Sequence, residues 1–593
     1  MKSSIYKLFL WSFIIGLSTS CNDDFLQRDP HVSITSDQFF RNVQDLETYT
    51  NGFYSQMQYS FEDLGSDNIS LNTGSNEVDQ VLVGGVSAGN VGGWSDWSDL
   101  RRINYMLARV DDVVGSEVEI NHFIGIARLF RAWFYIDKVQ RYSDVPWYDV
   151  DLSDTDEELL YKEKDPREIV VDNIIADLEF AAVNVKDGTD RTRVTKYAAI
   201  ALLSRFALYE GTFRKYHPEL GLTGSENALL ERALSAAEEV ISSGAFSVYS
   251  TGSVDDYSNL FKSPNLNGNP EMIWWVDSDE KLGVGNNTHV VYNWQWSLSK
   301  DLADTYLMGD GTPFTSQTDF DKKPFVKMFA DRDPRMMATI VHPGFKTTEA
   351  GDPVRTSPNF GGYLQVKYYP NESERKGWNL NYTDLPVIRY AEVLLNLAEA
   401  KAELGTLNQG DLDRTVNVLR SRVGMPALQL GIIADPYLGA QYPAISGNGT
   451  LLELRRERRV ELACEGFRYS DMMRWAAGDN FNLGQEGMYF PSLGAFDVTG
   501  DGIEDIAILE KPGSEGVLSG FSEEVRNSLS KFYLLDENGT PQSFYLSEGN
   551  KGFVRFTKNK DNPPMFEGPK YYYRPIPQQQ LVLNPNLEQT TFW

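Results

Sequence analysis

A chain of 593 residues, of which 41% are hydrophobic and 12% aromatic, has ample material for a large folded core. Its formal net charge of −29 repels nucleic acid, and no stripe of basic residues offsets that charge. Beyond the first 20 residues, no segment approaches the roughly 20 apolar residues of a membrane-spanning helix. Composition therefore argues against a nucleic-acid-binding protein and against a helical membrane protein.

The first 20 residues are predicted to be a lipoprotein signal peptide. Two lysines precede the apolar stretch LFLWSFIIGL, and three small residues (STS) then lead to Cys21. The apolar stretch is about half the length that spans a bilayer. A small-residue run that ends on Cys resembles a bacterial lipobox, although Leu17 lies four residues before Cys21 and the usual spacing is three. We therefore expect Cys21 to be acylated and to begin the mature chain.

The residues around Cys21 also bear on where the protein is located. The alternative to acylation of Cys21 is a disulfide with Cys464, which is the other of the two cysteines. It is disfavoured because Cys464 lies in a charged helical stretch. The sequence NDDF after Cys21 resembles the acidic signal that sends some Gram-negative lipoproteins to the outer face of the outer membrane. We expect a lipid-anchored protein of the outer membrane, exposed at the cell surface.

Helical periodicity dominates two regions, residues about 35–245 and 386–477. In the segment 195–211, Thr195 is a plausible N-cap and Gly211 a plausible stop. A similar segment, which ends at Gly244, begins about 33 residues further on, and such a pair is typical of a tetratricopeptide-type hairpin. Further helices are expected at 43–58, 97–114, 123–142, 166–184, 386–404, 411–423 and 451–477. The prediction is a mainly α fold on a tetratricopeptide-like helical-repeat scaffold.

Two other regions are expected to be irregular. Residues 245–385 are rich in long loops, and residues 478–593 form an irregular C-terminal region. Short β segments are predicted at 272–276, 363–369 and 552–557, between residues that favour turns. Long loops in a compact protein usually bind or cover something, so we predict that 245–385 is the binding region. Because no linker-like segment divides the chain, residues 21–593 are predicted to be a single domain.

A charged run, LRRERRVELACEGFRYSDMMRW, could indicate a phosphate site or an acid/base centre. Its charges, however, have neighbours of opposite sign at helical spacing. We expect four such pairs: Glu453 with Arg456, Arg458 with Glu461, Glu465 with Arg468, and Asp471 with Arg474. This pattern favours a structural helix held by salt bridges.

Three patterns that could indicate an enzyme carry little weight. GVSAG matches the nucleophile-elbow pattern around Ser87, but the residues that follow cannot easily begin the helix that such an elbow needs. The five histidines are scattered and form no metal-binding motif. Paired carboxylates for glycoside hydrolysis stay open, because their separation in space cannot be read from a sequence. No catalytic residue is predicted.

The segment DVTGDGIED resembles an oxygen-rich calcium loop. It places Asp497, Thr499, Asp501 and Asp505 around Gly502, which would allow the sharp turn of such a loop. The twelfth position of a full EF-hand would be Ile508, which cannot supply a carboxylate. Structural calcium is thus a possible ligand, with a plain Asp/Gly turn as the default. No other cofactor is predicted.

Aromatic residues are the second signal for binding. In YNWQW, alternation would place Tyr292, Trp294 and Trp296 on one side of an extended segment. Exposed aromatic rings pack against the C–H faces of sugars, while neighbouring polar side chains bind the hydroxyls. Packing in the hydrophobic core is the commoner alternative for such residues.

Seven stretches, which run from end to end of the chain, share their order and position with one known family. The stretches are CNDDFLQRDP, GIARLFRAWFYIDKVQRYSDVPW, RVTKYAAIALLSRFALY, ADRDPRM, PVIRYAEVLLNLAEAKAELG, RRERRVELACEGFRYSDMMRW and YYYRPIPQQQLVLNPNLEQTTFW. Together they resemble the SusD/RagB outer-membrane lipoproteins. Most of these residues would belong to the scaffold.

This resemblance implies a cell-surface lipoprotein that binds an oligosaccharide or polysaccharide and breaks no bond in it. Its partner would be a SusC-like, TonB-dependent outer-membrane transporter, to which it delivers the glycan. In the RagB branch the cargo is a peptide, which is the main alternative, and a surface glycoside hydrolase is a third. Family members tend to bind glycans near the loops before the Trp97 helix and around YNWQW. The candidate ligand-binding residues are therefore Trp94, Tyr292, Trp294 and Trp296.

Overall fold

The computed structural model describes residues 39–593, except residues 75 and 484. The predicted signal peptide and Cys21 lie outside these residues. Within them, no helix has the length and apolar character needed to cross a membrane. The chain is about 44% helical with few short strands, which confirms a mainly α fold.

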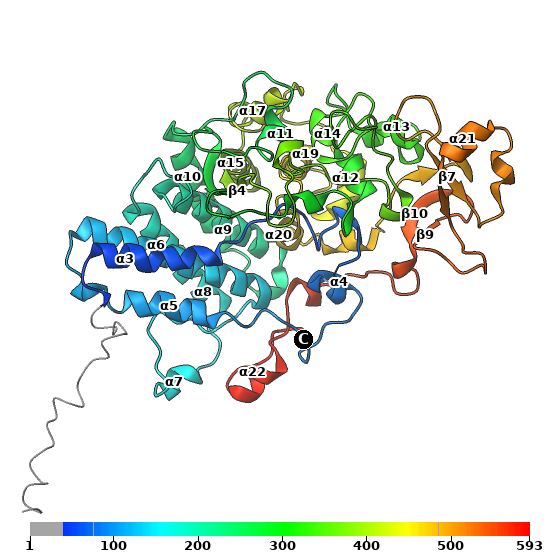
Figure 1. Ribbon diagram of the computed structural model, residues 1–593. Helices are drawn as coiled ribbons and strands as arrows, with labels where there is room; N and C mark the ends of the chain where they lie inside the picture. Colours follow the sequence, from blue (N-terminus) through cyan, green and yellow to red (C-terminus); the bar gives the residue numbers. More distant parts are fainter. Residues whose placement is uncertain (1–38, 75, 484) are drawn as a thin grey trace, which may run out of the picture.

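The N-terminal half consists of helices that pack side by side. They are α3 (Val43–Thr50), α4 (Glu77–Leu82), α5 (Trp97–Leu107), α6 (Glu117–Tyr142), α7 (Glu157–Leu160), α8 (Arg167–Asn184), α9 (Lys196–Tyr216) and α10 (Glu226–Ser242). In Figure 1, α3, α5, α6 and α8 form one layer, and α9 and α10 continue it toward the middle of the molecule. Antiparallel neighbours of this kind are the arrangement that the repeat pattern predicts.

Helix α9 continues beyond Gly211, so the predicted stop there is wrong. The Thr195 side chain caps the helix as expected, by accepting a hydrogen bond from the backbone of Ala198. Gly211 has a different role, because it lets α10 approach. A Cβ atom at this position would lie 2.9 Å from Cγ of Leu230 and 3.2 Å from its backbone nitrogen. The glycine thus sets the spacing between the two helices.

Substitution of Gly211 by valine should separate these helices. We expect Gly211→Val to lower the free energy of unfolding by about 1–3 kcal/mol, the usual cost of overpacking. Gly520→Val is the matched control, because nothing lies within 4 Å of a Cβ there. It should shift stability by no more than about 0.5 kcal/mol. Urea denaturation followed by circular dichroism measures both. Equal shifts for the two variants would contradict this account of Gly211.

The helices of the second half are shorter. They are α11 (Asp256–Asn259), α12 (Lys300–Thr305), α13 (Phe325–Met328), α14 (Pro334–Thr339), α15 (Tyr390–Glu403), α16 (Gln409–Asp413), α17 (Val416–Arg422), α18 (Pro436–Gln441), α19 (Gly449–Glu461), α20 (Arg468–Arg474), α21 (Glu523–Ser528) and α22 (Gln578–Leu583). The helix predicted at 411–423 is divided into α16 and α17. That predicted at 451–477 is divided into α19 and α20, because Cys464 and Gly466 adopt positive φ.

In the described part of the chain, ten short strands form four small sheets. The strands are β1 (Ile69–Asn72), β2 (Met272–Val276), β3 (Trp296–Leu298), β4 (Leu385–Arg389), β5 (Tyr489–Phe490), β6 (Gly494–Phe496), β7 (Ile506–Leu509), β8 (Ser530–Tyr533), β9 (Phe544–Leu546) and β10 (Gly552–Phe556). The sheets are β1–β3, β2–β4, β5–β10–β9 and β6–β7–β8, and only the β7–β8 pair among these strands is parallel. The strands predicted at 272–276 and 552–557 are confirmed as β2 and β10.

Two secondary-structure predictions fail for identifiable reasons. Residues 386–389, at the start of a predicted helix, belong to β4, since Val387 and Ile388 are β-branched and Ile388 pairs with Trp274 of β2. Residues 363–369 form no strand, because Tyr368 has a φ of 71° and interrupts the extended backbone. Gln365 there makes an isolated bridge with Ile340.

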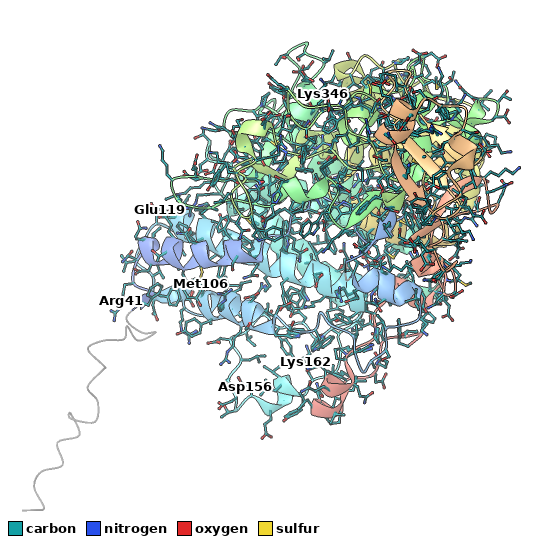
Figure 2. All side chains as sticks on the ribbon, turned by 45° about the vertical axis from the view of Figure 1, so that its right-hand side comes forward. Arg41, Met106, Glu119, Asp156, Lys162 and Lys346 are labelled. Atoms are coloured by element: carbon teal, nitrogen blue, oxygen red, sulfur yellow. The ribbon has the colours of Figure 1, made fainter. Side chains whose placement is uncertain are left out.

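The largest hydrophobic core runs from Phe40 to Leu587 and therefore joins both ends of the described chain. A second core lies under the loop-rich region and includes Trp275 and Trp296. The segment between α6 and α8, which carries α7, leaves the helical layer and lies beside α22 (Figure 1). We call this segment the excursion, and Figure 2 labels Asp156 and Lys162 in it. The Asn584 side chain binds the backbone oxygen of Lys162 there, at 2.9 Å.

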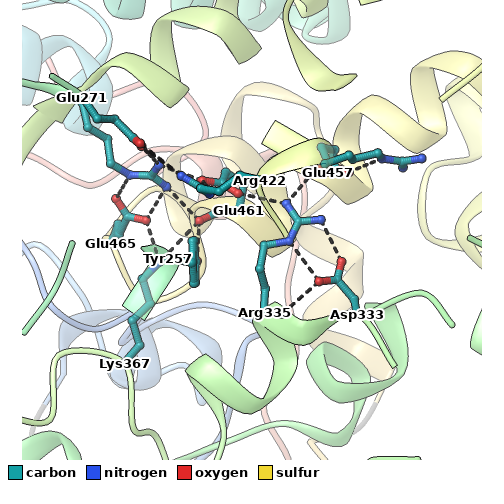
Figure 3. A network of polar contacts seen from close by, with 11 residues as sticks. Tyr257, Glu271, Asp333, Arg335, Lys367, Arg422, Glu457, Glu461 and Glu465 are labelled. Atoms are coloured by element: carbon teal, nitrogen blue, oxygen red, sulfur yellow. Dashed lines mark hydrogen bonds and ion pairs between the residues drawn. The ribbon is translucent and has the colours of Figure 1, made fainter. Parts of the chain in front are cut away.

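The charged run is buried in a network of ion pairs, part of which Figure 3 shows. The network consists of Glu271, Asp333, Arg335, Lys367, Arg389, Arg420, Arg422, Glu457, Glu461 and Glu465. Each of these side chains is at most 5% exposed. These ten residues carry five positive and five negative charges, and the network continues from Arg420 to Glu453 at 3.7 Å. They tie α14, α17 and α19 to β2 and β4, at the base of the loop-rich region.

Glu461 is the centre of this network. Its carboxylate lies 2.6 Å from Arg422, 2.7 Å from Arg389 and 2.9 Å from Arg335. Burial alone would raise the pKa of Glu461, but the three guanidinium groups outweigh burial and hold the pKa well below its ordinary value. The carboxylate is therefore ionised although it is fully buried.

Two of the four ion pairs predicted for the charged run are confirmed, Glu453–Arg456 and Asp471–Arg474. The other two are wrong, because their members find partners in distant segments. Arg458 pairs with Asp471, whereas Arg468 pairs with Asp67. The run nevertheless has the structural role that was expected of it.

Candidate functional site

An exposed group of aromatic rings lies on the loop-rich region. Trp294 and Trp378 are 51% and 58% exposed, which is unusual for side chains of this size. Their ring centres are 6.0 Å apart and their planes differ by 47°. The ring of His289 lies 5.9 Å from that of Trp378, nearly perpendicular to it. We call Trp294, Trp378 and His289 the aromatic surface.

Local backbone geometry brings these rings to the outside. Trp294 follows Asn293, whose φ of 53° turns the chain between a 3₁₀ turn at Thr288–Val291 and strand β3. Trp378 follows Gly377, whose φ of 128° is accessible mainly to glycine. Both aromatic residues thus stand at turns, where an outward-pointing side chain meets no neighbouring strand.

Asparagine side chains join the two loops that carry the aromatic surface. Asn287 donates a hydrogen bond to the side chain of Asn379 and accepts one from its backbone, both at 2.6 Å. The backbone of Asn286 donates to that of Asn381 at 2.8 Å. Asn381 in turn contacts Nδ1 of His289 at 2.9 Å. These contacts hold the rings of the two loops at a fixed distance.

Free polar groups border the aromatic surface. Asn293 and Gln295 flank Trp294 and are both exposed. Neither side-chain amide bonds to another residue in the described part of the chain, so each could donate to and accept from a ligand. Exposed rings beside free amides can bind a molecule that presents both C–H faces and hydroxyl groups.

Asp384 fixes the backbone where one of these loops begins. Its carboxylate accepts hydrogen bonds from the backbone nitrogens of Leu266 (2.8 Å) and Ser278 (3.0 Å). Burial raises the pKa of Asp384 to about 6, although these two bonds favour the charged form. At neutral pH the ionised carboxylate therefore fixes the start of the 278–294 segment.

The structure corrects the expected platform of Tyr292, Trp294 and Trp296. Trp294 alone of the three is exposed, while Trp296 is 4% exposed and donates its indole N–H to Gln365 at 3.0 Å. Tyr292 is half-buried and its ring packs against that of Tyr369. The turn at Asn293 is the reason, because it ends the alternation on which the prediction depended.

Trp94 does not join the aromatic surface. It is 7% exposed and its ring packs edge-on against Tyr142, with centres 4.9 Å apart. It borders an apolar groove of about 670 Å³ between α5, the excursion beside α22, and α22 itself. Burial of this ring argues against the stacking role that was predicted for it.

In the predicted calcium loop, the aspartate carboxylates accept hydrogen bonds from the backbone of the loop itself. Asp497 accepts hydrogen bonds from Gly500 and Gly502, and Asp505 accepts them from Val498 and Thr499. Asp501 accepts from the backbone of Ile503, and the hydroxyl of Thr499 is buried. This geometry favours the plain Asp/Gly turn. Calcium binding stays a prediction, which titration of the purified chain with calcium chloride would measure.

Among residues 39–593 other than 75 and 484, the metal-binding and nucleophile sites considered from the sequence do not form. No group of three or more His, Cys, Asp or Glu side chains there could hold a metal ion. Ser87 lies in a turn region, and neither a strand nor a helix adjoins it as an elbow requires. Cys464 is a buried free thiol whose pKa burial raises well above its ordinary value.

Sequence reasoning missed Trp378 and His289 as partners of Trp294. The segment GWNLNY at 377–382 offered a usable signal, because it places a tryptophan among glycine and asparagine residues that favour exposed turns. His289 offered no such signal, since a single histidine is uninformative without its neighbours.

Comparison with known proteins identifies one family. Residues 265–593 match the model of the SusD family. SusD-like protein P25 from Formosa agariphila is 22% identical over 533 residues, which cover 79% of this chain and 90% of that protein. A SusD-like carbohydrate binding protein from Bacteroides fragilis has a similar structure, with 21% identity and a TM-score of 0.65. The alignment covers 93% of this chain and 100% of that one.

A laminarin binding SusD-like protein is a second structural relative. It is 18% identical with a TM-score of 0.56, and 93% of this chain and all of the relative are covered. At these identities the two structural likenesses show the fold, which is the helical tetratricopeptide-like fold predicted from the sequence.

Proposed function

Since this chain belongs to the SusD family, we propose that it captures an oligosaccharide or polysaccharide at the aromatic surface. The observation that carries the proposal is the exposed pair Trp294 and Trp378, held by asparagine contacts between two loops. The family includes carbohydrate-binding members, and one structural relative binds laminarin.

The geometry suits a glycan whose successive rings turn relative to one another. Each indole offers a flat apolar face to one sugar ring, and the 47° between the two planes would follow a curved chain. The amides of Asn293 and Gln295 would bind the hydroxyls at the ring edges. Binding would need no catalytic group, so the protein would hold the glycan without cleaving it.

Captured glycan would then pass to a SusC-like, TonB-dependent transporter in the same membrane. Proteins of the SusD family are outer-membrane-associated surface proteins. Acylation of Cys21 would anchor this chain in that membrane.

A binding screen tests the proposal. The purified chain should bind at least one curved glucan, such as laminarin or amylose, on an array that also carries flat cellulose oligosaccharides and peptides. Incubation with the bound glycan should release no new reducing ends. Binding to peptides alone would instead support a peptide-capture subunit, and release of reducing ends would identify a hydrolase.

A further inference from the structure

A separate cleft lies inside the helical layer and shares no residue with the aromatic surface. It has a volume of about 330 Å³ and lies where α6, α9, β4 and α20 meet. This volume is at the lower end of the range for small-molecule sites in proteins. One helical face supplies much of the wall, since Trp133, Asp137 and Gln140 follow one another on α6 at helical spacing.

The cleft combines aromatic rings with unused polar groups. Trp133, Phe206 and Phe467 line it, as do the side chains of Gln140, Tyr209 and Ser470. In the part of the chain that the structure describes, the amide of Gln140, the hydroxyls of Tyr209 and Ser470 and the indole N–H of Trp133 form no hydrogen bond. None of them is among the polar atoms that are sealed from solvent. They are therefore available to a ligand in the cleft.

The charged groups of the cleft are nearly all satisfied by one another. Its lining holds four arginines and four carboxylates. Arg205 pairs with Glu392 at 2.6 Å, Arg389 with Glu465 at 2.7 Å, and Arg458 with Asp471 at 2.9 Å. Arg474 also binds Asp471, and the fourth carboxylate, Asp137, lies 3.6 Å from Lys138. An anionic ligand would find no unpaired arginine here and would lose its hydration.

We propose that this cleft binds a neutral, hydroxyl-rich molecule of one or two sugar rings. Hydroxyls of the sugar would meet Gln140, Tyr209 and Ser470, and its C–H groups would contact the half-buried ring of Phe467. The site goes beyond the proposed capture function, because it takes a short sugar in the interior whereas the aromatic surface is open to a long chain. It uses none of the capture residues and stands independently of them.

Titration with a defined panel tests this site. Calorimetry and saturation-transfer NMR would use the purified chain with glucose, galactose, mannose, xylose, N-acetylglucosamine, maltose and cellobiose. Glucuronate serves as the anionic probe. We expect saturable binding of at least one neutral sugar, and no binding of glucuronate. Absence of saturable binding for every neutral sugar, or binding of glucuronate alone, would overturn the proposal.

Two variants locate the binding. Gln140→Leu removes an amide, and Ser470→Met fills part of the cleft with a larger side chain. Each should weaken binding of the sugar at least tenfold and leave the thermal unfolding midpoint nearly unchanged, since neither side chain has a protein partner to lose. The double variant Trp294→Ala, Trp378→Ala should bind the short sugar as the wild type does. Unchanged affinity in both cleft variants would place the sugar elsewhere and refute the assignment, whatever the glycan array shows.

Discussion

Replacement of Glu461 by glutamine is expected to lower the free energy of unfolding by about 3–5 kcal/mol, the range for breaking a buried ion pair on one side. Glu461 is fully buried and contacts Arg335, Arg389 and Arg422 within 2.9 Å. Without its charge, these three buried guanidinium groups would each lose a carboxylate partner. A shift of the urea denaturation midpoint, monitored by circular dichroism, measures the effect.

An exposed ion pair provides the matched control for Glu461. Glu238 contacts Arg414 at 2.7 Å, but these side chains are 42% and 36% exposed. Glu238→Gln makes the same chemical change at the surface and should cost less than about 1 kcal/mol. A double variant, Glu461→Gln with Arg422→Met, should recover part of the loss, because it removes one uncompensated charge. If Glu461→Gln cost no more than Glu238→Gln, the network would not be needed for stability.

Replacement of both Trp294 and Trp378 by alanine should abolish detectable glycan binding. Each exposed indole would lose its contact with a sugar ring, and a central aromatic anchor typically contributes about 2 kcal/mol or more, or roughly 30-fold in affinity. Two such losses together would bring a typical glycan affinity below detection. Because both rings are more than half exposed, stability should change by no more than about 0.5 kcal/mol. Calorimetry with the glycan found on the array gives the affinity.

Two further variants test whether the loss of glycan binding is specific to Trp294 and Trp378 or is a general effect of removing an aromatic ring. Tyr161→Ala removes another exposed aromatic ring, which is 46% exposed and lies in the excursion beside α22, and should leave glycan affinity unchanged. Trp296→Ala removes a buried ring and should destabilise the fold by about 3–5 kcal/mol. Full glycan binding by the Trp294 and Trp378 double variant would refute the aromatic surface as the capture site.

The network and the aromatic surface are connected through the fold. Arg389 lies on β4, which pairs with β2, and the loop that follows β2 leads to Trp294. The other loop, which carries Trp378, enters β4 directly. The ion pairs thus stabilise the base from which both loops of the aromatic surface extend.

Much of the scaffold could be predicted from the sequence. Helices such as α8 and α10 are visible in their apolar periodicity, because a helix depends on residues three and four positions apart. The family was recognisable from motifs that run along the whole chain, and the family match over residues 265–593 confirms it. Cys21 lies outside the described residues, so its acylation stays a prediction.

The aromatic surface and the ion partners were decided by tertiary structure alone. The sequence could not show that Trp296 turns inward while Trp294 meets Trp378 from a distant loop. Nor could it show that Glu461 pairs with three distant arginines and not with Arg458 on its own helix. Local patterns determine local structure, whereas exposure and charge pairing depend on which distant segments the fold brings into contact.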